Sequence, residues 1–327
     1  MNTTTDITVL VCTYNRREDL RELLQSVLAQ ETGGAFRYEI LVVDNNSNDG
    51  TRELVEALAA GHDNLRYLFE QRQGKSFAMN AGLNVARGAI YQIADDDLLL
   101  PPDYLRRVWQ AFQTHPEVSI VAGKVLPQWS GAVPQWLTQA HWSALALSDY
   151  GATEFYTDAN KPICLLAGAF RRADVEALGG YHRELGVAPN RIGGTEDVDL
   201  LARMYAAGCK GLYLPDLWLR HKVEPERLTK RYHRRWHSGH GRFYALMRAP
   251  EIERSTKRRF DVPLHLYRQA AADTAAWLSA TAGGRAAAAF ERETRLRFFA
   301  GFFRARAKEL IESVPLAALT RRFKKEA

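Results

Sequence analysis

Three adjacent carboxylates, Asp95, Asp96 and Asp97, are the residues of this 327-residue chain best suited to binding a cation. Like charges in contact repel one another, so such a triplet is tolerated only where a cation or hydrogen-bond donors neutralise it. Carboxylate oxygens are the ligands that magnesium and manganese prefer, and these ions usually also bind phosphate oxygens of a substrate. The triplet therefore predicts a divalent-metal site that works on a phosphorylated ligand.

A second acidic pair, Glu196 and Asp197, stands where the sequence predicts the start of a helix. Acidic side chains are favourable at that position through the helix dipole alone, so the pair is compatible with a structural role and with a catalytic one. His221 follows a predicted strand, and an isolated histidine of this kind is more often packed than a ligand. The roles of all three residues stay open from spacing alone.

Two further polar segments, at Asp44 and at Lys75, can each be interpreted in more than one way. Asp44 ends an apolar run and precedes a segment rich in Asn, Ser and Asp, which turn formation alone would favour. A calcium loop starting at Asn45 is rejected, because a strand precedes it and asparagine replaces the usual first aspartate. Lys75 and its neighbours are similar to the end of a P-loop, but Phe69 stands where that motif requires glycine. Lys75 could still bind a phosphate at the start of the following helix.

The elements that must position these residues alternate between strand and helix. Apolar runs rich in β-branched residues predict buried strands, and apolar residues at helical spacing predict helices between them. The predicted strands cover residues 7–12, 39–43, 65–69, 89–94, 118–122, 163–170 and 211–214, and the predicted helices cover residues 20–28, 51–58, 77–85, 101–115 and 195–207. This order predicts an α/β fold with a mainly parallel central sheet and helices on both faces. Ligands bind such sheets beyond the carboxyl ends of the strands, where Asp44 and the acidic triplet would lie.

The charge of the chain is distributed unevenly. The net charge is +6, but residues 222–327 carry 24 Lys and Arg against 11 Asp and Glu, which leaves the preceding part acidic. Within this basic tail, phenylalanines between residues 290 and 303 are interleaved with arginines on a predicted helix. The pattern is typical of a helix lying in a membrane interface, and equally of a helix docked on its own catalytic domain. Because residues 321–325 are also basic, we favour an anionic membrane surface as a partner of this tail.

Three histidines in the tail, His233, His237 and His240, have a helical spacing that could bind zinc. No cysteine or acidic partner is close to them in sequence, so we interpret them as part of a basic helix face. The N-terminus lacks a basic segment followed by an apolar stretch, and no run is long enough to cross a bilayer. We therefore expect a cytoplasmic protein, with peripheral attachment to the inner face of the cell membrane if the tail binds lipid.

Taken in order, several segments resemble the family 2 glycosyltransferases, enzymes with a GT-A fold. The resemblance extends from about Ile7 to Val223, and the ordered set is far more specific than any single motif. The matching positions are residues 11–16, 42–47 and 78–82, the acidic triplet, Gly168, residues 179–181 and 196–200, and His221. The resemblance implies inverting transfer from a nucleotide diphosphate sugar, such as a UDP-sugar, to a hydroxyl of a glycan or lipid-linked acceptor. Cell-surface polysaccharide or glycolipid biosynthesis is the process it implies.

The resemblance also implies a role for each matching residue. Asp197 would be the general base and Glu196 would orient the sugar or acceptor. Asp97 and His221 would hold a manganese or magnesium ion. The residues that would bind the nucleotide sugar are Thr13, Tyr14, Asn15, Arg16, Asp44, Asn46, Lys75, Asn80, Asp95, Asp96 and Gly168.

Two features depart from the family pattern. The family often has an arginine where Met79 stands, so one cationic contact is missing or is supplied by Lys75 or Arg72. Tyr232 replaces the glutamine of the Gln-x-x-Arg-Trp motif carried by the processive synthases, and their membrane helices are absent from the sequence. These departures predict a non-processive enzyme.

The domain organisation follows from the same patterns. We expect a catalytic domain over residues 1–225, with a nucleotide-sugar half at about 1–125 and an acceptor half at about 126–225. Residues 127–161 are rich in aromatic residues but show little periodicity, and we interpret them as an insertion over the sheet edge. Residues 226–327 would form a basic helical extension.

Two other functions are compatible with parts of the chain. A nucleotidyltransferase could share the fold and the metal, but it would normally carry a glycine-rich basic loop, which residues 13–16 are not. A nucleic-acid-binding protein could use the basic, aromatic tail, but this function leaves the acidic triplet without a purpose. We therefore expect a glycosyltransferase and no nucleic-acid partner.

Overall fold

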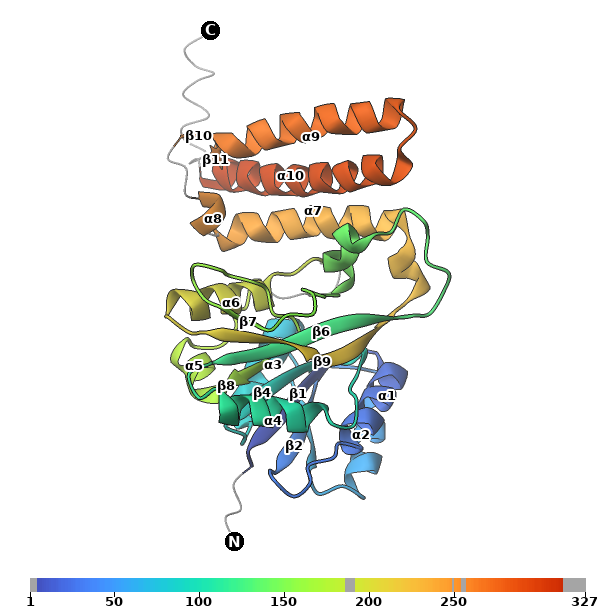
Figure 1. Cartoon of the computed structure of the whole chain (residues 1–327), viewed down its shortest axis with the longest axis vertical. Helices are drawn as coiled ribbons and strands as arrows, with labels where there is room; N and C mark the ends of the chain where they lie inside the picture. The colour runs from blue at the N-terminus through green and yellow to red at the C-terminus, as the bar shows by residue number, and fades with distance from the viewer. Residues whose placement is uncertain (1–4, 186–191, 249, 254–256, 314–327) are drawn as a thin grey trace. The chain divides into compact units, whose positions relative to one another are not determined.

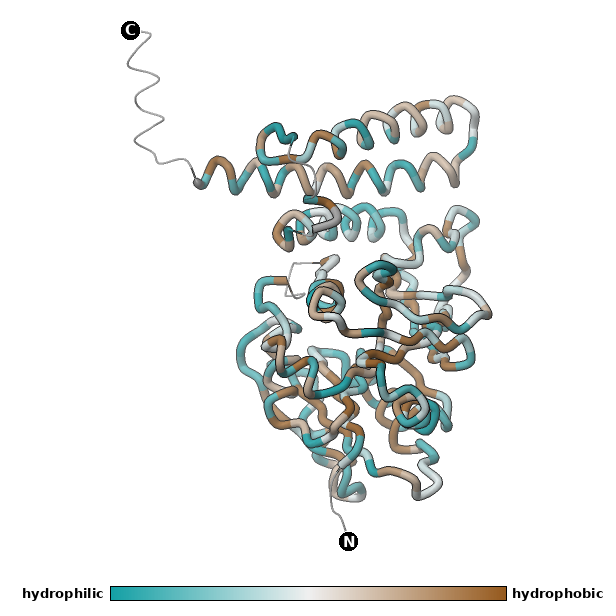
Figure 2. The backbone as a smooth tube through the Cα atoms, turned by 60° about the vertical axis from the view of Figure 1, so that its left-hand side comes forward, coloured by the Kyte–Doolittle hydropathy of each residue, from teal (hydrophilic) through white to brown (hydrophobic). Residues whose placement is uncertain are grey.

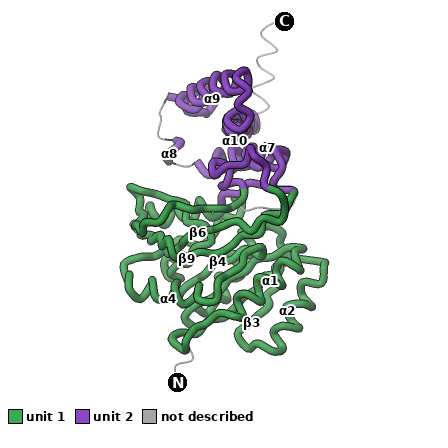
Figure 3. Tube along the Cα trace, turned by 45° about the vertical axis from the view of Figure 1, so that its right-hand side comes forward, with its two compact units in different colours: residues 1–132, 145–190, 196–225 green, residues 133–144, 191–195, 226–327 purple. Residues whose placement is uncertain are grey.

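The computed structural model describes residues 5–185, 192–248, 250–253 and 257–313. The chain divides into two compact units (Figure 3). Unit 1 comprises residues 1–132, 145–190 and 196–225, and unit 2 comprises residues 133–144, 191–195 and 226–327. Two short segments from the first two thirds of the chain therefore belong with the C-terminal helices.

Unit 1 is built on a nine-stranded sheet with the order β3-β2-β1-β4-β8-β6-β9-β5, and β7 also pairs with β9 (Figure 1). The parallel half consists of β1 (Ile7–Thr13), β2 (Tyr38–Asp44), β3 (Leu65–Phe69) and β4 (Ile90–Asp95). A further long parallel pair joins β6 (Ile120–Trp129) to β9 (Gly211–Val223). The antiparallel pairings are short and involve β5 (Leu98–Leu99), β7 (Phe155–Thr157) and β8 (Ala169–Arg171). The predicted α/β class with a mainly parallel sheet is confirmed.

The helices of unit 1 bury one apolar side each. They are α1 (Arg17–Leu28), α2 (Thr51–Ala59), α3 (Lys75–Val85), α4 (Tyr104–Thr114), α5 (Arg172–Ala177) and α6 (Glu196–Ala206). The 3-10 turns η1 (Gln139–Leu145) and η2 (Pro225–Leu228) cross the boundaries between the units and lie mostly in unit 2. In α1 the buried residues Leu20, Leu23 and Leu24 follow the spacing read from the sequence. Gly82 lets α3 approach the sheet, because a Cβ at this position would lie 2.3 Å from the Leu10 side chain. Figure 2 shows hydrophobic residues in brown both within unit 1 and along the helices of unit 2, where they alternate with hydrophilic residues in teal.

Two strands differ from their predicted lengths. β8 has only three residues where residues 163–170 were expected, because Ala167 adopts a left-handed conformation with φ of 47° that ends the extended run. β9 runs well past residue 214 to Val223, with a bulge between Tyr213 and Trp218 opposite Ala122 and Lys124 of β6. His221 therefore lies within a strand and does not follow one. The predicted insertion over residues 127–161 contributes the end of β6 and all of β7 to the sheet.

Unit 2 consists mainly of α7 (Lys230–Met247), α8 (Pro250–Glu253), α9 (Leu264–Ala282) and α10 (Ala286–Ser313), with a short hairpin of β10 (Arg258–Arg259) and β11 (Val262–Pro263). α10 lies between α7 and α9 (Figure 1) and packs along both. Glycines allow α7 and α10 to touch, since a Cβ at Gly241 would lie 2.0 Å from the Phe298 carbonyl oxygen. A Cβ at Gly301 would lie 1.9 Å from the carbonyl oxygen of Ser238. This close crossing fixes which side of α10 is buried.

The phenylalanines of α10 pack inside unit 2. Phe290, Phe299 and Phe302 are buried, and Phe298 and Phe303 are partly buried against the same core. Packing within unit 2 therefore already covers these side chains, and binding of the tail to an anionic membrane surface stays a prediction. In the described part of the chain no helix has the length and hydropathy to span a bilayer. Residues 321–325, which also supported the membrane prediction, lie outside the described residues.

Arginines of α10 also make internal contacts. Arg306 is fully buried and pairs with Glu253 and Asp261. Arg292 and Arg295 share the buried carboxylate of Asp273, at 2.9 and 3.0 Å. Part of the positive charge counted in the tail is therefore neutralised within unit 2.

The interpretation of His233, His237 and His240 as a basic helix face is wrong. His233 is fully buried, and its ring lies edge-on to Trp136 with centroids 5.1 Å apart. Burial lowers the pKa of His233 to about 4, that of His237 to about 3 and that of His240 to about 4. His240 stacks on Trp236 with a centroid separation of 4.3 Å. These side chains are neutral aromatic packing groups at neutral pH.

Candidate active site

The carboxyl ends of neighbouring parallel strands bring several predicted residues together. The strand register pairs Thr13 of β1 with Asp44 of β2, and Cys12 of β1 with Asp95 of β4. The polar ends of β2, β1 and β4 therefore stand side by side at one edge of the sheet. The Thr13 hydroxyl donates a hydrogen bond of 2.8 Å to Asp96, which joins the end of β1 to the acidic triplet.

The carboxylates of the triplet have different cationic partners. Lys75 Nζ lies 2.9 Å from Asp95 Oδ1, and Arg16 Nε lies 3.0 Å from Asp96 Oδ1. Arg16 also reaches Asp97, at 3.4 Å. Burial and the neighbouring Asp97 carboxylate raise the pKa of Asp96, while Arg16 opposes this rise. Two cationic side chains thus bring the three acids together but carry less charge than the acids do when all are ionised.

Asp97 and His221 are distant in sequence and adjacent in the structure. β5 pairs antiparallel with β9, so that Leu98 lies opposite His221. Asp97 Oδ1 then lies 3.0 Å from His221 Nε2, and both side chains are buried. A carboxylate oxygen and an imidazole nitrogen this close together can bind the same divalent ion. Within the described ranges no group of three or more His, Cys, Asp or Glu is arranged to hold a metal, so ligand oxygens and water would have to complete the coordination.

Lys75 joins the acidic triplet to the second acidic pair. Its Nζ, at the start of α3, lies 3.5 Å from Asp197 Oδ2 and 3.6 Å from Glu196 Oε1, in addition to its contact with Asp95. Burial opposes the positive charge of Lys75, but the carboxylates of Asp197, Asp95 and Glu196 raise its pKa well above the ordinary value. Lys75 is therefore a positively charged group shared by three acids from two elements, Asp95 of β4 and the Glu196–Asp197 pair of α6.

The two acids at the start of α6 differ in accessibility. The Glu196 side chain is 4% exposed, whereas the Asp197 side chain is 34% exposed. Burial raises the pKa of both carboxyl groups, and the charge of Lys75 opposes that rise. Asp197 is thus the acid of this pair that a ligand can reach, and its affinity for a proton is above that of a free aspartate.

α3 and α6 are both tied to the segment of residues 178–181 by residues that do not belong to the cluster. Asn80 forms two hydrogen bonds of 2.8 Å with the backbone of Tyr181, one through its amide nitrogen and one through its oxygen. Arg203 donates to the carbonyl oxygens of Leu178 and Gly180, and it also pairs with Asp199. The amide of Asn80 is thus engaged with the Tyr181 backbone, and its expected nucleotide-sugar role stays a prediction.

The residues expected to bind the nucleotide line the ends of β1 and β2. Asp44 is buried, and its two oxygens accept hydrogen bonds of 2.8 Å from the Tyr67 hydroxyl and the Ser47 backbone N–H. A carboxylate has further lone pairs, so a nucleobase could still donate to Asp44. Asn15 has φ of 53° and links the two loops, because its backbone N–H donates to Ser47 Oγ. Tyr14 is 42% exposed, and its ring offers a face on which a base could stack.

Gly168 and Asn46 were also expected to bind the nucleotide sugar, and they lie in different surroundings. The Gly168 carbonyl oxygen accepts a hydrogen bond from the backbone N–H of Ile93, so the glycine loop lies beside the last residues of β4. A Cβ at Gly168 would lie 3.3 Å from both the Leu165 carbonyl oxygen and the Phe170 ring, which leaves little room for a side chain. Asn46 is exposed with φ of 70°, and the structure ties it to none of the acids of the cluster.

Sequence reasoning missed Tyr67, Arg203 and Glu224 as supports of the site. Glu224 lies 2.9 Å from Arg16 and helps to position the guanidinium beside the acidic triplet. Tyr67 could have been found from strand register, because β3 pairs with β2 so that Tyr67 lies opposite Val42, two residues before Asp44. Arg203 stands four residues after Asp199 on a predicted helix, a spacing that indicates an ion pair. Glu224 carried no such local signal.

Comparison with known proteins agrees with this arrangement. The family described as glycosyl transferase family 2 matches residues 8–178 of the chain. The succinoglycan biosynthesis protein ExoM of Rhizobium meliloti is 27% identical over 249 residues, which cover 75% of this chain and 77% of ExoM. The mannosyltransferase PcManGT of Pyrobaculum calidifontis, solved in complex with GDP-Man and Mn2+, aligns with a TM-score of 0.55 at 21% identity, over 99% of this chain and 80% of that one.

A second solved structure has a similar fold. Residues 1–349 of TarS from S. aureus, in complex with UDP, align with a TM-score of 0.52 at 17% identity, over 95% of this chain and 93% of that one. At these identities the two structures establish the fold, and the family match over more than half of the chain establishes the class. The chain belongs to the family 2 glycosyltransferases and has their GT-A fold.

Proposed function

We propose that this glycosyltransferase moves a sugar from a nucleotide diphosphate sugar, with a UDP-sugar as the first candidate, to a hydroxyl of a glycan or lipid-linked acceptor. The observation that carries the proposal is the convergence on Lys75 of Asp95 with Glu196 and Asp197, next to the Asp97–His221 pair. This arrangement supports a metal-bound diphosphate beside a carboxylate that would take a proton. The ligands of TarS and PcManGT, UDP and GDP-Man, support a nucleotide-sugar donor. The name of ExoM supports a role in polysaccharide biosynthesis.

Asp97 and His221 would hold manganese or magnesium. Their side chains fit this task, because they are buried and their oxygen and nitrogen atoms already lie 3.0 Å apart. When bound, the ion would offset the negative charge that develops on the departing diphosphate. Arg16 lies between Asp96 and Asp97 and would add a second positive charge on the same side. The excess of acids over cations at these strand ends supports a cation there.

Asp197 would be the general base. A sugar hydroxyl is a weak nucleophile at neutral pH and needs to lose its proton as it attacks. Asp197 is the accessible member of its pair; burial raises its pKa, and the positive charge of Lys75 opposes that rise. Glu196, almost fully buried, would instead orient the sugar or acceptor. A single displacement of this kind needs one base and inverts the anomeric centre.

A screen of nucleotide sugars against the full chain would test this function. We expect a UDP-sugar to raise the melting temperature when manganese is present, and its sugar to be transferred to a suitable acceptor or slowly to water. Release of a free nucleoside diphosphate would report both reactions. Transfer of a nucleotidyl group with release of pyrophosphate, or the absence of binding by any nucleotide sugar, would overturn the proposal. We also expect one sugar to be added per encounter, because Tyr232 stands where processive synthases carry glutamine.

A further inference from the structure

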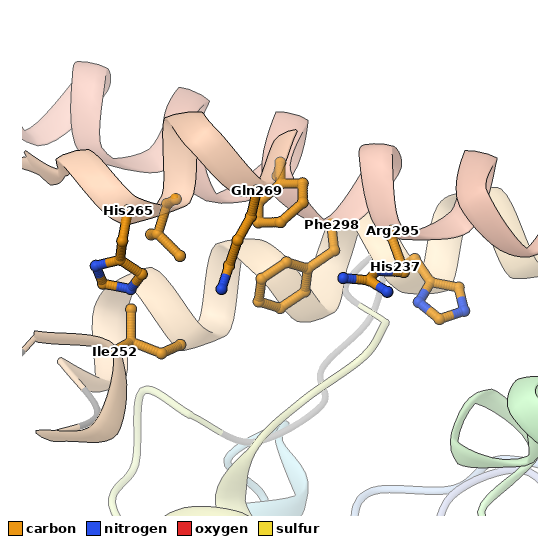
Figure 4. Close-up of a pocket in the computed structure, with 8 residues that line it drawn as sticks. His237, Ile252, His265, Gln269, Arg295 and Phe298 are labelled. Carbon is orange, nitrogen blue, oxygen red and sulfur yellow. The ribbon is translucent and has the colours of Figure 1, made fainter. Parts of the chain in front are cut away.

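Unit 2 contains a cavity of about 410 Å³ between α7, α8, α9 and α10 (Figure 4). One part of its wall is polar and is formed by His237, His265, Gln269 and Arg295. The other part is apolar and is formed by Ile252, Leu266, Phe298 and Phe299. The volume falls in the range of pockets that bind small molecules, and such pockets combine an apolar lining with a few polar groups.

The polar wall is rich in hydrogen-bond donors. Arg295 shares Asp273 with Arg292, so two guanidinium groups are matched by one carboxylate and the pair retains positive charge. His237 Nε2 is buried and has no hydrogen-bond partner in the described structure. Burial lowers the pKa of His237 to about 3, so its ring is neutral and can donate through one N–H. Among the described residues, no Asp or Glu lines the cavity. A ligand with negatively charged oxygens suits this wall.

The donors and the apolar side chains are not evenly mixed. In Figure 4, Arg295 and His237 lie together at one end of the cavity, whereas Ile252 lies at the other end beside His265, with Gln269 and Phe298 between them. Leu266 and Phe299 are buried and also belong to the core of unit 2. An anionic group at the arginine end would leave the rest of the ligand against apolar side chains. The cavity therefore suits a molecule with a charged head and a hydrocarbon chain.

We propose that this cavity binds an alkyl phosphate, a phosphate monoester of a hydrocarbon alcohol. The phosphate oxygens accept hydrogen bonds from Arg295 and His237, since a guanidinium group binds phosphate through paired donors. The hydrocarbon runs along Phe298 towards Ile252 and is removed from water. The site is distinct from the acidic cluster of unit 1, and the inference does not depend on the identity of the sugar donor.

Calorimetric titration of the full chain with four probes would test the site. Octyl phosphate is the matching ligand, inorganic phosphate lacks the chain, octanol lacks the charge, and octyl glucoside replaces the charged head with a neutral sugar. We expect octyl phosphate, kept below its micelle concentration, to bind at least ~10-fold more tightly than each of the others, the scale of one charge-assisted hydrogen bond. Equal binding of inorganic phosphate would indicate a simple anion site, and equal binding of octyl glucoside or octanol would indicate an unselective apolar site. Either result would overturn the proposal.

Matched variants test whether octyl phosphate binds in the cavity or elsewhere on the surface. Arg295→Gln should weaken octyl phosphate by at least ~10-fold, whereas Arg297→Gln, which removes a charge paired with Glu293 on the same helix, should leave binding unchanged. Gln269→Trp, at an exposed cavity-lining position, should block entry without disturbing the buried core. Thermal melts would show that each variant is folded, and nucleotide binding by unit 1 should stay the same. Unchanged affinity in both Arg295→Gln and Gln269→Trp would refute the assignment.

Discussion

Unit 1 and unit 2 both bury charged and titratable side chains, but in different settings. In unit 1, acids collect at the carboxyl ends of β1, β2 and β4, where Lys75 is shared among three carboxylates. In unit 2, Arg306 is fully buried and has carboxylates on two sides, from Glu253 and Asp261. The histidines of α7 are neutral and packed among aromatic rings.

The difference lies in whether the local charge is balanced. The acids around Lys75 and Arg16 outnumber these two cations, so the cluster gains from binding a further cation or from exchanging partners with a ligand. Around Arg306 the charges are balanced, because the three arginines Arg248, Arg258 and Arg306 pair with the three acids Glu253, Asp261 and Glu309. Burial of charged groups therefore indicates a site at the strand ends of unit 1 and packing around Arg306 in unit 2, where the cavity lined by His237 and Arg295 is a separate feature.

The largest expected effect comes from removing the acid that would hold the metal. Asp97→Ala should reduce transfer by about 10³-fold, the scale of a lost electrostatic contact to the leaving group, with little change in melting temperature. A chelator should reduce the activity of the unchanged protein to a similar degree, and added manganese should restore it. Full activity in the chelator would remove the metal from the mechanism and weaken the contrast between the units.

Arg306→Met tests the balanced pairs of unit 2. The substitution leaves Glu253 and Asp261 without their buried partner, and we expect a loss of about 2–3 kcal/mol in the free energy of unfolding. Lys308→Met is the matched control, because Lys308 forms an exposed pair with Glu312 and should cost less than about 0.5 kcal/mol. Urea unfolding measures both values. Similar losses in the two variants would show that the buried pair has no special role in packing.

Lys75→Met tests the shared lysine of unit 1 through the pH dependence of the reaction. Loss of the positive charge disfavours the ionised form of Asp197, so its pKa should rise further. The acidic limb of the kcat/KM profile should then move to higher pH, with activity at neutral pH reduced about 10-fold. Lys124→Met, which removes a lysine paired with Asp149, should leave the profile in place. A lower rate with an unmoved acidic limb would mean that Lys75 does not act on the base.

The two units should also respond to pH in opposite directions. The histidines of α7 have a lowered pKa, so below about 6.5 the unfolded chain takes up protons that the folded unit excludes, and unit 2 should lose stability as the pH falls towards about 4. Glu196 has a raised pKa, so the folded unit 1 keeps a proton that the unfolded chain releases, and this contribution is lost as the pH rises. Hydrogen exchange of metal-free protein, corrected for intrinsic rates, would follow each unit separately. Parallel trends in the two units would contradict these assignments.

Much of the catalytic half of the fold could be predicted from the sequence. The runs at residues 7–12, 39–43, 65–69 and 89–94 are short and mainly apolar, with β-branched residues in all but the third, and they match β1 to β4 within a residue at each end. Because these strands are parallel, the polar residues that end them meet at one edge. The acidic triplet was visible for a related reason, since adjacent carboxylates have few structural uses.

The features that could not be predicted from the sequence depend on contacts between residues that are distant in the chain, which no local pattern specifies. His221 lies within β9 because that strand continues through Pro215 and Asp216, which interrupt the apolar run in the sequence. The phenylalanines of α10 form an apolar surface that the sequence shows, but only the structure identifies α7 and α9 as what covers it. Asn80 matched a family motif, whereas its hydrogen bonds with Tyr181 follow from tertiary packing.

The most direct test of the central claim is Asp197→Asn, assayed for donor binding and for transfer in the same preparation. The substitution keeps the size of the side chain and removes its proton affinity, so transfer should fall by at least ~10²-fold while donor binding persists. Asp103→Asn makes the same chemical change at the start of α4, where Asp103 pairs with Arg107, and it should leave transfer unchanged. Transfer within a few-fold of the unchanged protein in Asp197→Asn would contradict the assignment of the accessible acid beside Lys75 as the base.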